Sequence, residues 1–231
     1  MPKKRRERRE NCYLCGRSDN LTRDHIPPAC LFPEPRPSDL ITVPACHRCH
    51  DSYKLDDEYF RIFAAAGAPY DDPVGREIWD DKVMGSSLAR SQKLRQYIRS
   101  CLIDVEIRSP GGLYVGVAPG LTFDKERVDR VIQRIVRGLF HHHYRSRLPA
   151  DLEFLVLVDP KGKRAFPDVL AQAPKCRIGD GVFAYARKIG KEDPRYSMWW
   201  FLFYRSRLLI VFAEPSEDVR TSDGSEHNRA S

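Results

Sequence analysis

Apolar side chains recur with a helical period along residues 124–144, and this stripe predicts the clearest amphipathic helix of the chain. Its members are Val128, Val131, Ile132, Ile135, Val136, Leu139 and Phe140. Weaker helical patterns cover residues 72–101 and run from His50 to a stop at Gly67. The stripe is followed by His141–His143, and three consecutive residues cannot share one helix face, so this triplet does not predict a metal site.

Short apolar and β-branched runs predict strands elsewhere in the chain. A run at residues 40–43 fits a short strand, whereas Pro27-Pro28 and the later prolines of the same loop exclude a continuous helix before it. The local order near the N-terminus is therefore strand, loop, strand, helix. Further strands are predicted at 102–107, 113–117, 152–158, 182–189, 199–204 and 208–213, the first two forming a hairpin. Together the elements predict a mixed α+β fold with an antiparallel sheet.

Composition narrows the class of protein. The 231 residues carry a formal net charge of +7 and have a pI near 9.1, which suits a polyanionic partner without identifying one. No apolar run reaches about 18 residues, so no membrane-spanning helix is expected. The basic N-terminus lacks the apolar stretch of a secretory signal. We therefore expect a cytoplasmic protein with no membrane partner.

Four of the seven cysteines form two Cys-x-x-Cys pairs, Cys12 with Cys15 and Cys46 with Cys49. Two such pairs supply the four thiolates of a tetrahedral structural zinc site. The odd number of cysteines argues against a disulfide framework. A redox dithiol would need one pair near a β-α-β pattern, which the sequence lacks. The remaining three are expected to be small, buried, apolar side chains: Cys30, Cys101 and Cys176.

A second set of polar residues lies between and beside these pairs. The segment Asp24-His25-Ile26-Pro27-Pro28 lies between them, and His50 directly follows Cys49. Zinc does not need these groups, but a carboxylate beside a histidine, with a second histidine, suits metal-assisted hydrolysis of phosphodiesters. This order of residues resembles the HNH endonucleases, also called ββα-metal or His-Me finger nucleases. One bacterial and phage subgroup of that family is also similar at residues 31–33, 40–44 and 56–61.

The resemblance implies a role for each residue. His25 would be the general base, because a neutral imidazole can take a proton from water near neutral pH. Asp24 and His50 would bind one catalytic divalent ion, magnesium or manganese. Arg23 or Lys54 could add positive charge at the phosphate. The alternative is that Asp24 and His25 form a turn in which the imidazole only packs against the zinc site.

The sequence departs from the family pattern at one position. The family has an asparagine before the strand that enters the second cysteine pair, and Asp39 stands there in this chain. In the family this residue braces the loop and orients the catalytic histidine. Aspartate can accept the same hydrogen bonds but cannot donate those of an amide. The substitution therefore leaves a weakened, retuned or inactive site open.

These patterns predict four parts of the chain. They are a basic disordered tail (1–10), a zinc-containing HNH nuclease module (11–70), an α+β domain of unknown role (71–213) and a flexible polar tail (214–231). The basic tail either contacts DNA or only aids solubility. The predicted function is that of a metal-dependent DNA endonuclease, with DNA expected ahead of RNA as the partner. The alternative is a zinc-dependent nucleic-acid-binding or adaptor protein with little or no catalysis. The sequence does not set the oligomeric state.

Overall fold

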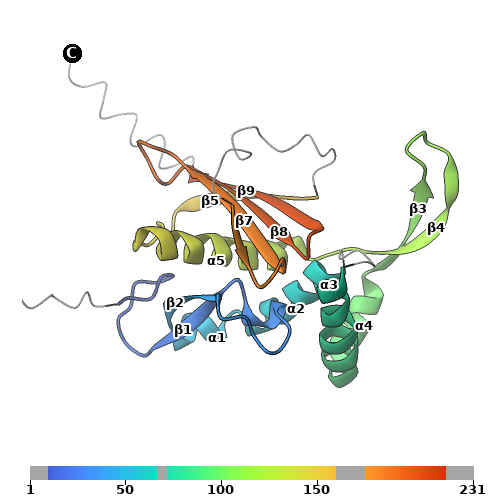
Figure 1. Cartoon of the computed structure of the whole chain (residues 1–231), viewed down its shortest axis with the longest axis horizontal. Helices are drawn as coiled ribbons and strands as arrows, with labels where there is room; N and C mark the ends of the chain where they lie inside the picture. The colour runs from blue at the N-terminus through green and yellow to red at the C-terminus, as the bar shows by residue number, and fades with distance from the viewer. Residues whose placement is uncertain (1–9, 67–71, 160–174, 217–231) are drawn as a thin grey trace, which may run out of the picture.

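The computed structural model describes residues 10–66, 72–159 and 175–216. Over these residues the predicted mixed α+β fold with antiparallel sheets is confirmed. Sheets of two, two and five strands follow one another along the chain, with helices between them (Figure 1). The predicted N-terminal tail, except for Glu10, and the predicted boundary near residue 70 lie outside the described residues. Of the predicted C-terminal tail, only residues 214–216 are described.

The N-terminal part has the predicted order of strand, loop, strand and helix. Strand β1 (Leu21–Ile26) pairs with antiparallel β2 (Ile41–Cys46), and the loop between them holds the short 3-10 helix η1 (Ala29–Leu31). Two helices follow, α1 (His47–Asp51) and α2 (Lys54–Ala65). One helix was expected from His50 onward, so the break is a correction. The Ser52 hydroxyl donates to the Cys49 carbonyl at 2.8 Å, and such a bond competes with the helical pattern where α1 ends.

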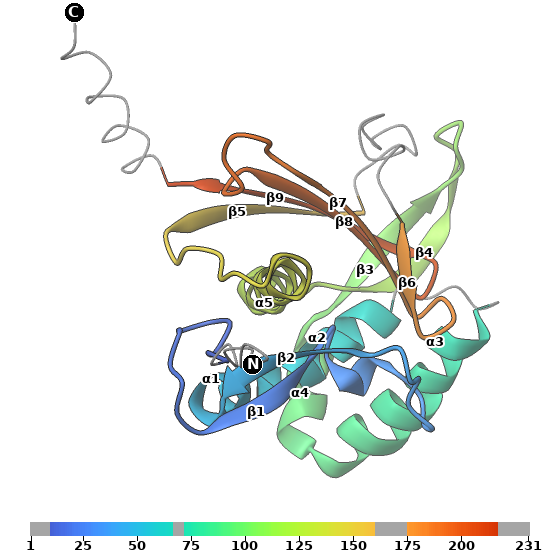
Figure 2. The ribbon, with the colours of Figure 1, turned by 60° about the vertical axis from the view of Figure 1, so that its left-hand side comes forward.

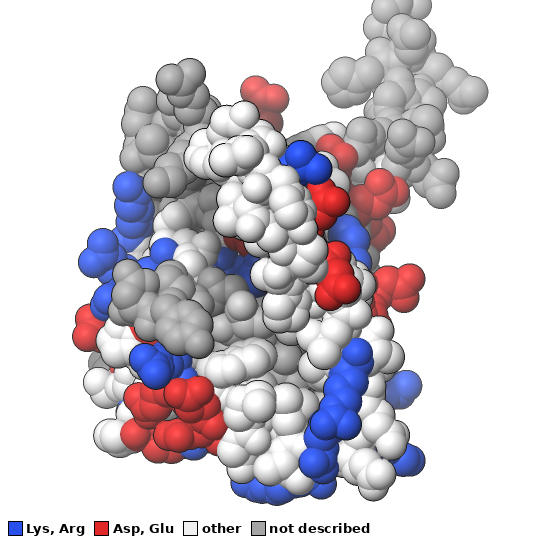
Figure 3. Space-filling model, turned by 90° about the vertical axis from the view of Figure 1, so that its right-hand side faces the viewer, with Lys and Arg blue, Asp and Glu red and all other residues white. Residues whose placement is uncertain are grey.

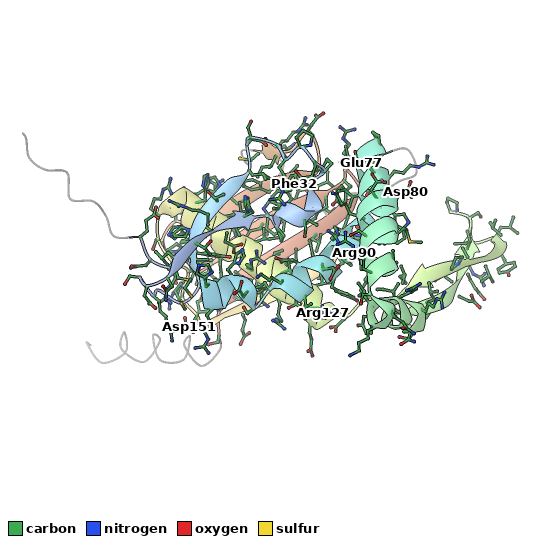
Figure 4. The ribbon with its side chains drawn as sticks, turned by 90° about the horizontal axis from the view of Figure 1, so that it is seen from below. Phe32, Glu77, Asp80, Arg90, Arg127 and Asp151 are labelled. Atoms are coloured by element: carbon green, nitrogen blue, oxygen red, sulfur yellow. The ribbon has the colours of Figure 1, made fainter. Side chains whose placement is uncertain are left out.

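The predicted helical region over residues 72–101 is confirmed but consists of several pieces. Helix α3 (Pro73–Glu77) runs into the π-helix η2 (Ile78–Leu88), and α4 (Gln92–Ser100) follows. Asp72 caps α3 by accepting hydrogen bonds from the amides of residues 74 and 75. Figure 4 shows Glu77, Asp80 and Arg90 along this helical stretch, which stands beside α2.

The predicted hairpin is formed by β3 (Leu102–Arg108) and β4 (Tyr114–Leu121), which form a two-stranded sheet and pair with no other strand of the described residues. It projects from the rest of the chain (Figure 1), and every residue of β3 is exposed. Uncharged side chains dominate the centre of the molecular face that carries it, with acidic and basic groups around them (Figure 3). The hairpin therefore adds little to the core.

The third sheet has the strand order β5-β9-β8-β7-β6, and all neighbours are antiparallel. The strands predicted from the sequence match four of these five. Their bounds are β5 (Leu152–Val158), β7 (Phe183–Ile189), β8 (Ser197–Phe203) and β9 (Arg207–Pro215). The edge strand β6 (Cys176–Ile178) was missed, because three residues are too few to show a period. Trp199 of β8 is fully buried in the core.

Helix α5 (Lys125–Tyr144) lies between the five-stranded sheet and the N-terminal part (Figure 2). Asp124 caps its first turn by accepting a hydrogen bond from the Arg127 amide. The predicted apolar stripe is buried, and one hydrophobic core runs from the N-terminal part through α5 to the sheet. In the described part of the chain, no helix is long and apolar enough to cross a lipid bilayer.

Candidate metal cluster and adjoining pocket

The four cysteines of the two Cys-x-x-Cys pairs come together in space. Cys12 and Cys15 lie on a turn before β1, while Cys46 ends β2 and Cys49 lies in α1. All four sulfur atoms lie within 4.8 Å of one another, and those of Cys15 and Cys46 are 3.6 Å apart. A tetrahedral zinc ion with bonds of about 2.3 Å requires sulfur separations of about 3.8 Å. The cluster could therefore hold a metal ion such as zinc.

The local backbone explains how the first pair reaches this position. The amide of Cys12 donates to the Arg17 carbonyl at 2.7 Å, and the Gly16 amide donates back to the Cys12 carbonyl at 2.8 Å. Gly16 has a φ of +80°, a conformation that glycine adopts without steric cost. Burial raises the pKa of the Cys12 thiol, but hydrogen bonds from nearby backbone amides outweigh it and lower that pKa to about 7. At Cys12 a thiolate, the form that binds metal, is thus accessible near neutral pH, whereas burial raises the pKa of the Cys49 thiol.

A pocket of about 560 Å³ lies beside the cysteine cluster and brings together three of the predicted site residues. Asp24 and His25 come from the end of β1, and His50 comes from α1. Atom Oδ1 of Asp24 lies 4.0 Å from Nε2 of His50. Adjacent residues of a strand point to opposite sides, so Asp24 is buried while His25 is partly exposed.

Asp24 is held by two buried side chains. Arg134 of α5 binds both of its oxygens, with Nη2 at 2.7 Å from Oδ1 and Nε at 3.1 Å from Oδ2. The hydroxyl of Tyr13 donates to Oδ2 at 2.7 Å. Asp24 and Arg134 are only 1% and 2% exposed. Burial raises the pKa of Tyr13 well above its usual value, so this phenol is neutral and acts as a donor.

Arg134 was not predicted as a site residue. It lies 110 positions after Asp24, and neither Cys-x-x-Cys pair is near it in the sequence. One signal was present, because Arg134 interrupts the apolar stripe of α5, three residues after Val131 and four before Gly138. A charged residue on the buried face of a helix requires a buried partner.

Two further carboxylates lie on the α2 side of the pocket. Asp57 accepts a hydrogen bond from Nη1 of Arg134 at 2.5 Å, and burial raises the pKa of Asp57. Glu58 accepts from the hydroxyl of Ser87 at 2.5 Å, and Arg61 also bonds to that hydroxyl. Ser87 belongs to η2, so this network ties the π-helix to the wall of the pocket.

His25 has the electrostatic setting of a base. Burial lowers its pKa below the usual value, and the nearby positive charge of Arg36 lowers it further, while Asp24 opposes the shift. The imidazole is therefore neutral at neutral pH. Arg36 lines the same pocket, as do Arg23 and Lys54. Each of these three side chains is about half exposed or more and pairs with an exposed carboxylate, so positive charge surrounds the opening.

Asp39 lies outside the pocket, and the three other cysteines differ in their burial. Asp39 is not among the residues that line the pocket, and both of its oxygens accept from the Gly179 amide at 3.3 Å. Cys101 is buried as expected, whereas Cys30 and Cys176 are only partly buried. Cys30 forms part of the pocket wall, and burial raises the pKa of its thiol to about 12. It is therefore not a thiolate at neutral pH.

The histidine triplet lies away from this pocket, at the end of α5. All three rings are partly buried, which agrees with their expected surface or partly buried position. Atom Nε2 of His143 lies 2.9 Å from the hydroxyl oxygen of Tyr185.

The comparisons with family models, with curated proteins and with solved structures give no match for this chain.

Proposed function

We propose that the chain is an HNH-type endonuclease that hydrolyses phosphodiester bonds of DNA. The observation that carries the proposal is the pocket in which Asp24, His25 and His50 meet beside a four-cysteine cluster. A strand, a loop, a second strand and a helix support these groups, and the resemblance of the sequence motif to HNH endonucleases implies that arrangement. A structural zinc ion on the four cysteines would fix the two strands and α1 relative to one another.

The donor set beside the cluster fits a catalytic divalent ion. Asp24 supplies a carboxylate oxygen and His50 an imidazole nitrogen, and their separation of 4.0 Å is less than twice a metal–ligand bond of about 2.1 Å. Asp24 and Asp57 place two carboxylates against the one guanidinium of Arg134, although five cationic side chains line the pocket as a whole. Bound there, a magnesium or manganese ion would supply positive charge to the phosphate and to the leaving oxygen.

His25 would take the proton from the attacking water. Its lowered pKa keeps the ring neutral near pH 7, and its partly exposed position beside the pocket leaves it accessible to water. The positive side chains at the opening, Arg23, Arg36 and Lys54, would contact DNA phosphates. None of these three is deeply buried, so each can exchange its exposed carboxylate partner for a phosphate.

Cleavage of supercoiled plasmid tests the proposal. Zinc-loaded protein is incubated with magnesium, manganese or EDTA, in the wild type and in His25→Ala. His47→Ala is the matched control, since His47 is an exposed histidine of α1 that does not line the pocket. We expect metal-dependent nicking or linearisation by wild type and His47→Ala, and loss of at least about 100-fold in His25→Ala with zinc content unchanged. Equal activity of His25→Ala and wild type would refute the role of His25.

The second candidate is a zinc-dependent nucleic-acid-binding protein with little or no catalysis. Two observations favour it. Asp39 is bonded to Gly179 instead of lining the pocket, and both oxygens of Asp24 already accept hydrogen bonds. In this case DNA binding, measured by fluorescence anisotropy, is the same in wild type and His25→Ala, and neither protein cleaves DNA with any of the metals.

A further inference from the structure

We propose that Arg134 is a positioning residue of the catalytic site and that it orients Asp24 toward His50. This inference rests on the proposed function, in which Asp24 and His50 hold a divalent ion. It gives the second half of the chain a defined part in the site, because Arg134 belongs to α5.

All three nitrogen atoms of the Arg134 guanidinium donate hydrogen bonds. Nη2 and Nε bind the two oxygens of Asp24, and Nη1 binds Oδ1 of Asp57. A planar group with donors in fixed directions can satisfy two carboxylates in this way, whereas the single ammonium of lysine cannot reproduce the geometry. The face of the guanidinium also lies over the ring of Tyr53, with the central carbon 4.9 Å from the ring centre. Its orientation is therefore fixed by three neighbours.

This geometry determines which oxygen of Asp24 can bind a further ligand. Oδ2 accepts hydrogen bonds from both Tyr13 and Arg134, whereas Oδ1 accepts one from Arg134 and faces His50. Oδ1 is thus the oxygen with capacity for a further ligand, since a carboxylate oxygen has two lone pairs. Without Arg134, the buried carboxylate of Asp24 and the partly buried carboxylate of Asp57 would lose the counter-charge that they share, and Asp24 could rotate. Outer residues that hold a metal ligand by hydrogen bonds typically change metal affinity about 10–100-fold when they are replaced.

The neighbouring Arg130 provides a matched control. It lies one turn earlier on α5, pairs with Asp56 at 2.9 Å and lies near the same ring of Tyr53, at 5.8 Å. Its side chain is 54% exposed, and it does not line the pocket. Arg130→Lys and Arg134→Lys therefore make the same chemical change on the same helix, and only the second removes a contact with Asp24.

The test measures manganese binding by electron paramagnetic resonance of the free ion, with the four cysteines already loaded with zinc. We expect Arg134→Lys to bind manganese about 10–100-fold more weakly than wild type, with unchanged zinc content, and Arg130→Lys to match wild type. Where cleavage is measurable, kcat should fall in Arg134→Lys while the KM for DNA stays within about twofold. If Arg134→Lys is not folded, Arg134→Gln takes its place, because its amide can still donate to Asp24.

Several results overturn the inference. One is manganese binding by Arg134→Lys as tight as that of wild type, and another is no manganese binding by wild type. Tyr13→Phe removes the other donor to Asp24 without changing a charge, and it should keep manganese affinity within about threefold. An equal loss in Tyr13→Phe would mean that any damage to this buried cluster has the same effect. Because the binding assay needs no cleavage, an inactive wild type that binds manganese refutes the nuclease and leaves the role of Arg134 testable.

Discussion

A close contact between α5 and β1 predicts how strongly the two halves of the chain are coupled in stability. Gly138 of α5 is buried against Ile26 at the end of β1. A Cβ atom placed on Gly138 would lie 2.5 Å from Cγ1 and 2.6 Å from Cδ1 of Ile26, closer than carbon atoms can pack. Gly138→Ala therefore forces the Ile26 side chain to change its conformation or α5 and β1 to move apart, one turn along the helix from Arg134.

The change in the free energy of unfolding caused by Gly138→Ala follows from two opposing effects. In the interior of a helix, replacing glycine by alanine is worth about 1 kcal/mol in favour of folding. Forcing an extra methyl group into a packed core costs about 1–3 kcal/mol. In the wild-type background, Gly138→Ala should thus destabilise the protein by about 0–2 kcal/mol. Ile26→Ala removes the three atoms that lie nearest to the new methyl group, at its own cost of about 2–5 kcal/mol. In that background, Gly138→Ala should stabilise by about 1 kcal/mol.

A double-mutant cycle measured by urea denaturation of zinc-loaded protein tests this reasoning. The four proteins are wild type, Gly138→Ala, Ile26→Ala and the double variant. A favourable coupling energy of about 1–3 kcal/mol is expected, because the effect of the alanine changes from neutral or destabilising to stabilising. Stabilisation of about 1 kcal/mol in both backgrounds would give no coupling, and it would show that α5 and β1 are not in such close contact.

Three further predictions concern metal and protons. Removing zinc with a strong chelator at neutral pH should unfold the N-terminal part, seen as a loss of near-ultraviolet circular dichroism, and adding zinc back should restore the signal. The ligands would be Cys12, Cys15, Cys46 and Cys49. The pKa of His25 is lowered, so its basic form persists in mild acid, and kcat/KM for DNA should decline only below about pH 6.5; a midpoint above pH 7 would contradict this. Burial lowers the pKa of His143 to about 4, so as the pH falls from about 6.5 toward 4 the unfolded chain takes up a proton that the folded chain does not, and stability decreases. His143→Gln, which can still bond to Tyr185 but cannot titrate in this range, should lose part of the difference in melting temperature between pH 7 and pH 5.

The elements that sequence predicts well are those with a long, regular pattern. Helix α5 repeats its apolar positions over more than three turns, from Val128 to Phe140, and the strands of the large sheet are apolar runs bounded by turns. The π-helix η2 was expected only as part of a helical region, since its altered hydrogen bonding leaves no separate sequence signature. Strand β6 is recognised by its pairing with β7. Such pairing between two separate segments cannot be deduced from the sequence of either segment by itself.

Within the site, too, the residues that lie close together in the sequence could be predicted and those that depend on long-range packing could not. Asp24, His25, His50 and the cysteines were found because they are close in sequence and follow a recognisable order. Their meeting in one pocket follows from the pairing of β1 with β2, which is a local event. Arg134 and the Gly179 partner of Asp39 depend on how α5 and the large sheet pack on this local unit. Predicting them requires the tertiary fold, of which a single sequence gives only hints such as a charged residue in an apolar stripe.

The buried carboxylate of Asp24 depends on a positive charge from a distant part of the sequence. A carboxylate that is 1% exposed is stable only with a counter-charge, and the fixed positive charge that the structure gives it comes from α5. The packing of Ile26 on Gly138 places α5 close enough for Arg134 to reach that carboxylate. Asp24 near the N-terminus and the helix more than 100 residues later are thus parts of one electrostatic unit. If the pocket hydrolyses DNA, the segment after residue 71 is needed for the geometry of the reaction itself, in addition to any part it has in recognition.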